Sequence, residues 1–248
     1  MLSLVLAAML AAAPLDGPHA ALLQIAQNEH GGGCETEQLR AAVAQSKITK
    51  LGRAGGGDII YATVESPCIC GNVNCPVYVV RLDGANPKLL YSNYAYSVVT
   101  VPAVPLASLV LRSHDSALVS DETLVAYRNG RYVEQRYTRV RGDNGERKPD
   151  AVPIRFPAGT SSTTLAGSAS TGWYDGYSFD AQQGQTLTVS GVRSKGKVNI
   201  TIFVPTIGGA IDVTPGKPVV LPHSGTYQMH VEVAADADVR YALTIAIR

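Results

Sequence analysis

The second half of the chain alternates apolar and polar residues almost without interruption. Apolar side chains fall at even positions over residues 197–204 and at odd positions over residues 227–233 and 239–247. A period of two is typical of antiparallel strands with one buried and one solvated face. Turns rich in Gly, Pro, Ser and Asp separate about eight such strands. The pattern therefore predicts an all-β antiparallel sandwich over residues 153–248.

The first half mixes two periodicities. Residues 17–51 carry short apolar stripes at helical spacing, among them Leu22, Leu23 and Ile25, and then Leu39 and Val43. Strand-like runs follow, and Asn129-Gly130 between the last two predicts a tight hairpin because both positions tolerate positive φ. The expected strands are 58–64, 77–82, 89–91, 96–101, 109–112, 123–128 and 131–133. We expect an α+β N-terminal domain over residues 17–138, with helices packed on an antiparallel sheet.

Residues 139–152 differ in composition from both halves. Seven charged residues crowd a stretch without apolar period, and Pro149 and Pro153 lie at its end. Such a composition is typical of an interdomain linker. The expected fold is thus an α+β domain, a linker and an all-β sandwich.

The N-terminus predicts export. Residues 1–13 form an apolar segment ending in a small-x-small pattern, as in a signal peptide, and the segment is too short to span a bilayer as a helix. No cysteine follows it, which argues against a lipoprotein anchor. We expect a periplasmic or secreted protein without membrane insertion after signal cleavage.

Four cysteines, Cys34, Cys68, Cys70 and Cys75, fit an oxidising compartment and predict two disulfides. Three pairings are possible. Cys68 and Cys70 are too close to bridge well, which favours Cys70–Cys75 and Cys34–Cys68. A zinc site is the alternative, but the spacing departs from the usual paired C-x2-4-C pattern.

Catalytic signatures are weak. His30-Gly31-Gly32-Gly33 copies an oxyanion-hole phrase of esterases, but the Gly-x-Ser-x-Gly nucleophile that it requires is missing. The histidines form no His-Glu-x-x-His pair, and His114-Asp115-Ser116 predicts a turn, because triads are assembled in space. A net charge of +1 gives no basis for nucleic-acid binding. We therefore expect a protein that is not an enzyme and that uses no cofactor or metal.

Several short sequence segments of the second half of the chain resemble segments of a known family. They run from Pro153-Ile154-Arg155-Phe156-Pro157 through Trp173-Tyr174-Asp175-Gly176-Tyr177 and Gly184-Gln185-Thr186 to Ser224-Gly225-Thr226-Tyr227. Their order resembles the periplasmic inhibitors of g-type lysozyme and, more loosely, the β-sandwich modules at the C-termini of secreted bacterial pre-peptidases. The Cys-Gly-x-x-x-Cys-Pro phrase and the Asn-Gly-Arg-Tyr hairpin of the first half resemble an uncharacterised bacterial periplasmic module.

The resemblance implies a function. Such inhibitors insert sandwich loops into the active-site cleft of a lysozyme, so the implied partner is a lysozyme, most of all a g-type one, or another peptidoglycan hydrolase. By position, Tyr174, Asp175 and Tyr177 correspond to the family's contact segment. The family's arginine-bearing segment is replaced by the acidic residues 234–240, which leaves the basic turn with Arg193 and Lys195 as another source of the inserting side chain.

Two other functions stay open. The sandwich is alternatively a non-catalytic cell-envelope module that binds carbohydrate or protein, or the first domain is a hydrolase of unrecognised type. Saturable binding to purified peptidoglycan would favour the former. Loss of turnover on replacing His30 or His114 would favour the latter.

Overall fold

The computed structural model describes residues 14–30, 33–84, 86–142, 144–205 and 209–248. The chain divides into two compact units: residues 1–113 with 124–135 form unit 1, and residues 114–123 with 136–248 form unit 2. The strands β7 (Val119–Arg128) and β8 (Arg131–Arg141) contribute residues to both. The expected signal peptide, residues 1–13, lies outside the described residues, as do Gly31 and Gly32 of the esterase-like phrase. Neither described helix is long and apolar enough to cross a membrane.

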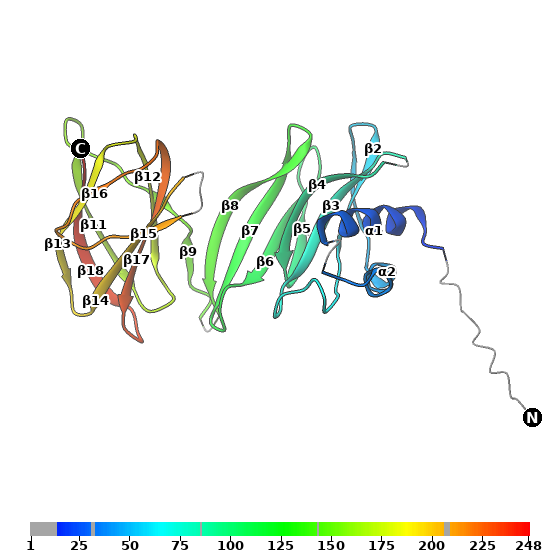
Figure 1. Cartoon of the computed structure of the whole chain (residues 1–248), viewed down its shortest axis with the longest axis horizontal. Coiled ribbons are helices and arrows are strands. Elements are labelled where there is room, and N and C mark those ends of the chain that lie inside the picture. Colours follow the sequence, from blue (N-terminus) through cyan, green and yellow to red (C-terminus); the bar gives the residue numbers. More distant parts are fainter. Residues whose placement is uncertain (1–13, 31–32, 85, 143, 206–208) are drawn as a thin grey trace, which may run out of the picture. The chain divides into compact units, whose positions relative to one another are not determined.

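Unit 1 is built mainly from strands, with the helices α1 (Gly17–His30) and α2 (Thr36–Gln45) at its start (Figure 1). One sheet has the order β1-β2-β3-β4, and a second sheet has the order β5-β6-β7-β8-β9, of which residues 114, 119–123, 136–141 and 147–149 are assigned to unit 2. The remaining strand bounds are Thr49–Ala54 (β1), Gly57–Thr63 (β2), Cys75–Leu82 (β3), Lys88–Ala95 (β4), Ser97–Val101 (β5), Ser108–His114 (β6) and Arg147–Pro149 (β9).

The expectation of an α+β N-terminal domain is wrong, because the two short helices cover only one face of one sheet. On that face Leu22, Leu39 and Val43 pack against strand residues such as Ile60 and Val80. The opposite face of the same sheet packs against the second sheet, so unit 1 is predominantly a β structure. The second core joins Ile59, Val77, Val79 and Leu90 to Leu109, Leu111, Val125 and Tyr132.

The sequence carried a sign of this second layer. Residues 77–80 of β3 form an unbroken apolar run, and each is at most 1% exposed. A strand that alternates buries one face, whereas an unbroken apolar run is typical of a strand covered on both faces. Helices cover one face of β3, and the second sheet covers the other.

The disulfides fix the start of unit 1. Cys34, just before α2, is bonded to Cys68, and Cys70 is bonded to Cys75 at the start of β3. This is the pairing that the sequence favoured. In the described part of the chain, no cysteine is free and no group of three or more His, Cys, Asp or Glu residues is placed to hold a metal ion.

Unit 2 contains two sheets that share one core. One has the order β10-β12-β17-β14-β15 and the other β11-β18-β13-β16. The inward residues come from both sheets, for example Phe179 and Met229 from the first and Leu243 and Ile245 from the second. The strands are Val152–Pro153 (β10), Ser162–Ala169 (β11), Asp175–Ala181 (β12), Thr186–Ser194 (β13), Lys197–Phe203 (β14), Ala210–Asp212 (β15), Val219–Val220 (β16), Gly225–Ala234 (β17) and Val239–Ile247 (β18).

The stretch expected as a linker, residues 139–152, carries the end of β8, the whole of β9 and the first residue of β10. β10 pairs in parallel with β12, where Val152 lies opposite Tyr177. Gly176 admits this approach, since a Cβ there would lie 1.5 Å from the carbonyl oxygen of Asp150. The charged stretch therefore belongs to unit 2 and lies against its sandwich.

Candidate binding surface at one end of the C-terminal sandwich

Strand pairing in unit 2 brings three connections to the same end of the sandwich. Ala169, the last residue of β11, lies opposite Val239, the first residue of β18. Lys197, the first residue of β14, lies opposite Ala234, the last residue of β17. The connections at this end, called here the loop end, are residues 170–174, 195–196 and 235–238.

Trp173 anchors the loop end. Its side chain is 1% exposed, and three cations lie over its ring: Arg141 at 4.6 Å, Lys148 at 5.1 Å and Arg139 at 5.4 Å from the centroid. An indole face attracts cations, and the attraction is stronger when both partners are desolvated. All three cations come from the stretch expected as a linker, so that stretch holds the 170–174 loop in place.

Tyr174, the residue after Trp173, contacts the same Arg139 guanidinium. The guanidinium of Arg139 lies 3.2 Å from the Tyr174 ring centroid and donates a hydrogen bond to the Tyr174 carbonyl. His230 of β17 also contacts Tyr174, and the two rings stack with their centroids 3.7 Å apart. Burial and the nearby charge of Arg139 lower the pKa of His230 to about 4. His230 is therefore a neutral member of an aromatic stack at neutral pH.

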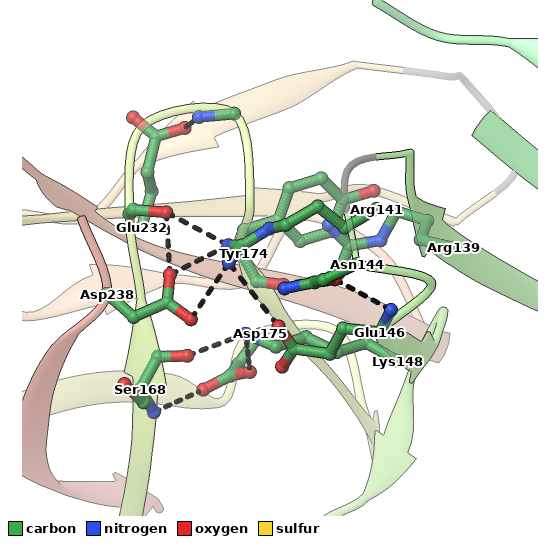
Figure 2. A network of polar contacts seen from close by, with 12 residues as sticks. Arg139, Arg141, Asn144, Glu146, Lys148, Ser168, Tyr174, Asp175, Glu232 and Asp238 are labelled. Atoms are coloured by element: carbon green, nitrogen blue, oxygen red, sulfur yellow. Dashed lines mark hydrogen bonds and ion pairs between the residues drawn. The ribbon is translucent and has the colours of Figure 1, made fainter. Parts of the chain in front are cut away.

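Asp175 is held in a network that Figure 2 shows from close by. Its carboxylate forms an ion pair with Lys148 at 2.8 Å and accepts hydrogen bonds from the Ser168 backbone N–H at 3.1 Å and the Tyr241 hydroxyl at 2.7 Å. The Tyr241 hydroxyl also lies 2.7 Å from that of Tyr177. The Lys148 and Asp175 side chains are only 14% and 17% exposed, so this is a largely desolvated pair with its hydrogen bonds satisfied.

Asp238, in the 235–238 connection, has its own cation. Arg141 donates to it at 2.7 Å, and the Ser170 hydroxyl donates to the same carboxylate at 2.7 Å. Desolvation raises the pKa of Asp238, but the hydrogen bonds from Arg141 and Ser170 outweigh it and hold that pKa below its usual value. The carboxylate therefore stays ionised and is paired within unit 2 with Arg141, which also forms an ion pair with Glu146 at 3.3 Å (Figure 2).

Exposed cations border an open groove beside this network. The groove has a volume of about 590 Å³ and is lined by residues where the end of β13 meets the start of β18, including Arg193, Lys195, Arg240 and Tyr241. The three cationic residues are exposed. Asp238 also lines the groove and is paired with Arg141, which forms a second ion pair with Glu146. The lining therefore carries three cations and one paired carboxylate. The groove therefore presents a net positive surface.

Two local features shape the basic turn that carries Arg193 and Lys195 and connects β13 of one sheet to β14 of the other. The pairing of β13 with β18 shifts between Ser190 and Arg193, which is typical of a β-bulge that redirects the strand. Within the turn, a Cβ on Gly196 would lie 2.6 Å from a methyl group of Val233, so only glycine allows this close packing. The turn is thus held against the sandwich.

The structure separates the five residues expected to contact a lysozyme. Arg193 and Lys195 are exposed and line the groove. Tyr177 is 9% exposed and packs in the core, Asp175 is occupied by Lys148 and Tyr241, and Tyr174 is half-buried between Arg139 and His230. The environments of these last three favour roles inside unit 2.

Sequence reasoning missed Arg139, Arg141 and Lys148. Arg139 is 1% exposed, and its burial lowers its own pKa, while the pKa of Asp150 is raised by burial against the opposing effect of Arg139. The two buried residues of β8, Tyr132 and Arg139, are seven residues apart and follow no period of two. The sequence therefore contained no sign that Arg139 is buried, because buried cations are rare unless they are paired.

No protein-family model matches the chain, and no curated protein matches it. The similar solved structures include three periplasmic lysozyme inhibitors of g-type lysozyme (PliG). The Salmonella Typhimurium protein is 25% identical with a TM-score of 0.36, and the match covers 40% of this chain and 98% of that one. An Escherichia coli PliG mutant is 25% identical (39% and 96% covered, TM-score 0.34). Aeromonas hydrophila PliG is 28% identical (40% and 96% covered, TM-score 0.34). The likeness is loose and partial.

Proposed function

We propose that this protein is exported and binds a lysozyme, in the first place a g-type enzyme, and inhibits it without any catalysis of its own. The observation that carries the proposal is the basic groove at the loop end, where Arg193, Lys195 and Arg240 are exposed on a rigid sandwich. The order of sequence phrases over residues 153–248, which resembles the g-type inhibitor family, supports the same partner.

The charge of the groove suits such a partner. Enzymes that cleave glycosidic bonds carry carboxyl groups in a cleft shaped for polysaccharide. A cationic side chain inserted there donates charge-assisted hydrogen bonds to those carboxylates, and exclusion of water strengthens them. Lys195 lies in the two-residue turn between β13 and β14, and Arg193 is the second-last residue of β13. We therefore assign insertion to this turn.

Acidic residues near the groove do not cancel this charge. Asp238 is paired with Arg141, which Glu146 shares, and Asp175 is paired with Lys148. Asp236 is exposed in the 235–238 connection and opposes the cations in part. The balance of exposed groups around the groove stays positive, which favours association with an acidic cleft.

The test is lysis of peptidoglycan by g-type, c-type and i-type lysozymes with and without the purified mature protein. We expect inhibition of the g-type enzyme, weakened about 100-fold by the double variant Arg193→Glu/Lys195→Glu, as for loss of hot-spot charges. Lys217→Glu is the matched control, because Lys217 is exposed and lies near β16, which pairs with the start of β13 rather than its end. If micromolar protein inhibits none of the three classes, the proposal fails.

A further inference from the structure

Unit 1 contains a polar cavity that the proposed function does not use. Its volume is about 480 Å³, within the range of small-molecule sites. It lies where the C-terminal end of α2 meets β1, β2 and the start of β5. The lining residues are Ala42, Gln45, Ser46, Lys47, Thr49, Tyr61, Thr63, Glu65, Tyr96, Ser97 and Val98.

The walls of this cavity are fixed by hydrogen bonds. Ser46, the residue after α2, donates from its backbone N–H to the Val43 carbonyl at 3.1 Å and from its hydroxyl to the Ala42 carbonyl at 3.0 Å. The ring of His19 joins Asp16 to the Ser46 carbonyl, which ties the end of α2 to the start of α1. Tyr61 is half-buried and packs against the core between the two sheets. A preformed site costs less to occupy, because little has to be ordered on binding.

The lining chemistry excludes several ligand classes. Lys47 and Glu65 give it one charge of each sign. The C-terminal end of α2 adds the negative end of a helix dipole and carbonyl acceptors, which disfavour phosphate and other anions. The described residues offer no cluster able to hold a metal ion. Most of the remaining lining is hydroxyl or amide, which disfavours a lipid.

The lining fits one class well. Hydroxyl and amide groups on Gln45, Ser46, Thr49, Thr63 and Ser97 both donate and accept hydrogen bonds, as the hydroxyls of a sugar require. Two tyrosines, Tyr61 and Tyr96, supply apolar ring surface with a polar end, and such rings pack against the C–H faces of a pyranose. We propose that this cavity binds a neutral saccharide of one or two rings. The proposal does not depend on lysozyme binding, which we assign to unit 2.

The experiment uses the full mature chain and saturation-transfer NMR with N-acetylglucosamine, chitobiose, cellobiose and maltose. We expect transfer to at least one of them, with Kd on the order of 0.1–1 mM, as suits a small open site. Tyr96→Ala should weaken binding at least about tenfold. Tyr94→Ala is the matched control, because Tyr94 is 41% exposed and Tyr96 is 40% exposed, but only Tyr96 lines the cavity.

A second variant, Gln45→Ala, distinguishes a loss of sugar binding from a loss of folding. Gln45 is exposed on the last turn of α2, so Gln45→Ala removes an amide without disturbing the core. We expect it to weaken binding with an unchanged melting temperature. The absence of transfer to any of the four sugars at about 10 mM would overturn the proposal, and so would equal binding by the wild type and Tyr96→Ala. Absence of sugar binding by a wild-type protein that still inhibits lysozyme would refute only the saccharide proposal.

Discussion

Acidification should destabilise unit 2 through His230, whose ring stacks on Tyr174 and lies 4.5 Å from the Phe203 ring centroid. Burial and the charge of Arg139 lower its pKa from 6.5 to about 4. The unfolded chain therefore takes up a proton at this residue below about pH 6.5, whereas the folded protein does so only near pH 4. The unfolding free energy is therefore unaffected by the His230 equilibrium above pH 6.5 and decreases as the pH falls from 6.5 toward 4.

The size of the effect follows from the gap between the two pKa values. At 1.36 kcal/mol per pH unit, linkage gives a loss of about 1.4 kcal/mol at pH 5.5 and about 3 kcal/mol at pH 4. Asp121 and Asp150 act in the opposite direction, because burial raises the pKa of each carboxyl and the folded state then holds its proton more tightly. A variant that lacks only the imidazole keeps both carboxyls and isolates the contribution of His230.

Urea unfolding at pH 7.0, 5.5 and 4.0 measures this directly. The only tryptophan of the sequence is Trp173, which is buried in unit 2 and whose fluorescence reports on that unit. We expect the unfolding free energy of the wild type to fall more steeply with acid than that of His230→Gln, with the two profiles diverging by about 3 kcal/mol at pH 4. Parallel profiles, or an NMR titration that places His230 near 6.5, would refute the reasoning.

Two further predictions concern stability. Asp175→Ala leaves the Lys148 ammonium and the Tyr241 hydroxyl without their shared acceptor, and should cost about 3 kcal/mol, or about 6–12 °C of melting temperature. Asp58→Ala is the control, because it removes only the exposed Lys50–Asp58 pair, and calorimetry should show little change in its melting temperature. Similar losses of melting temperature for Asp175→Ala and Asp58→Ala would contradict the prediction. Replacing Cys34 and Cys68 by Ser should cost unit 1 about 4 kcal/mol and replacing Cys70 and Cys75 about 2 kcal/mol, because the closed loops differ in length. Circular dichroism melts that rank the two pairs the other way would contradict the loop-entropy argument.

Local signals were the most reliable part of the sequence. The Asn129-Gly130 hairpin is present between β7 and β8, with φ of 51° and 84° at its two positions. The helical stripes correspond to α1 and α2. β1 was missed because its first three residues were included in the helical stretch 17–51, although Gly55 and Gly56, with φ of 61° and 91°, form a hairpin turn into β2. A Gly-Gly pair before a strand is itself a hairpin signal.

Layer assignment and the interior of the loop end could not be predicted in the same way. Which strands share a sheet depends on contacts between residues far apart in sequence, so the face-to-face packing of Val79 on Leu109 had no local sign beyond the apolar run in β3. Tyr177 and Asp175 match a contact segment by position, whereas the structure buries Tyr177 and pairs Asp175 inside unit 2. The partners of Asp175 are Lys148 and Tyr241, which lie 27 and 66 residues away along the chain.

The charge of the loop end depends on the same long-range contacts. Residues 234–240 taken alone have two aspartates and one arginine, which predicts repulsion from an acidic cleft. In the folded protein Asp238 is paired with Arg141 and Asp175 is paired with Lys148, and the exposed cations Arg193, Lys195 and Arg240 outnumber the carboxylates that line the groove. Residues 139–152, which have the composition of a linker, therefore supply the cations that pair with carboxylates inside unit 2. The outward electrostatics of this surface follow from which carboxylates are already paired inside the unit, and not from the composition of the loop that carries them.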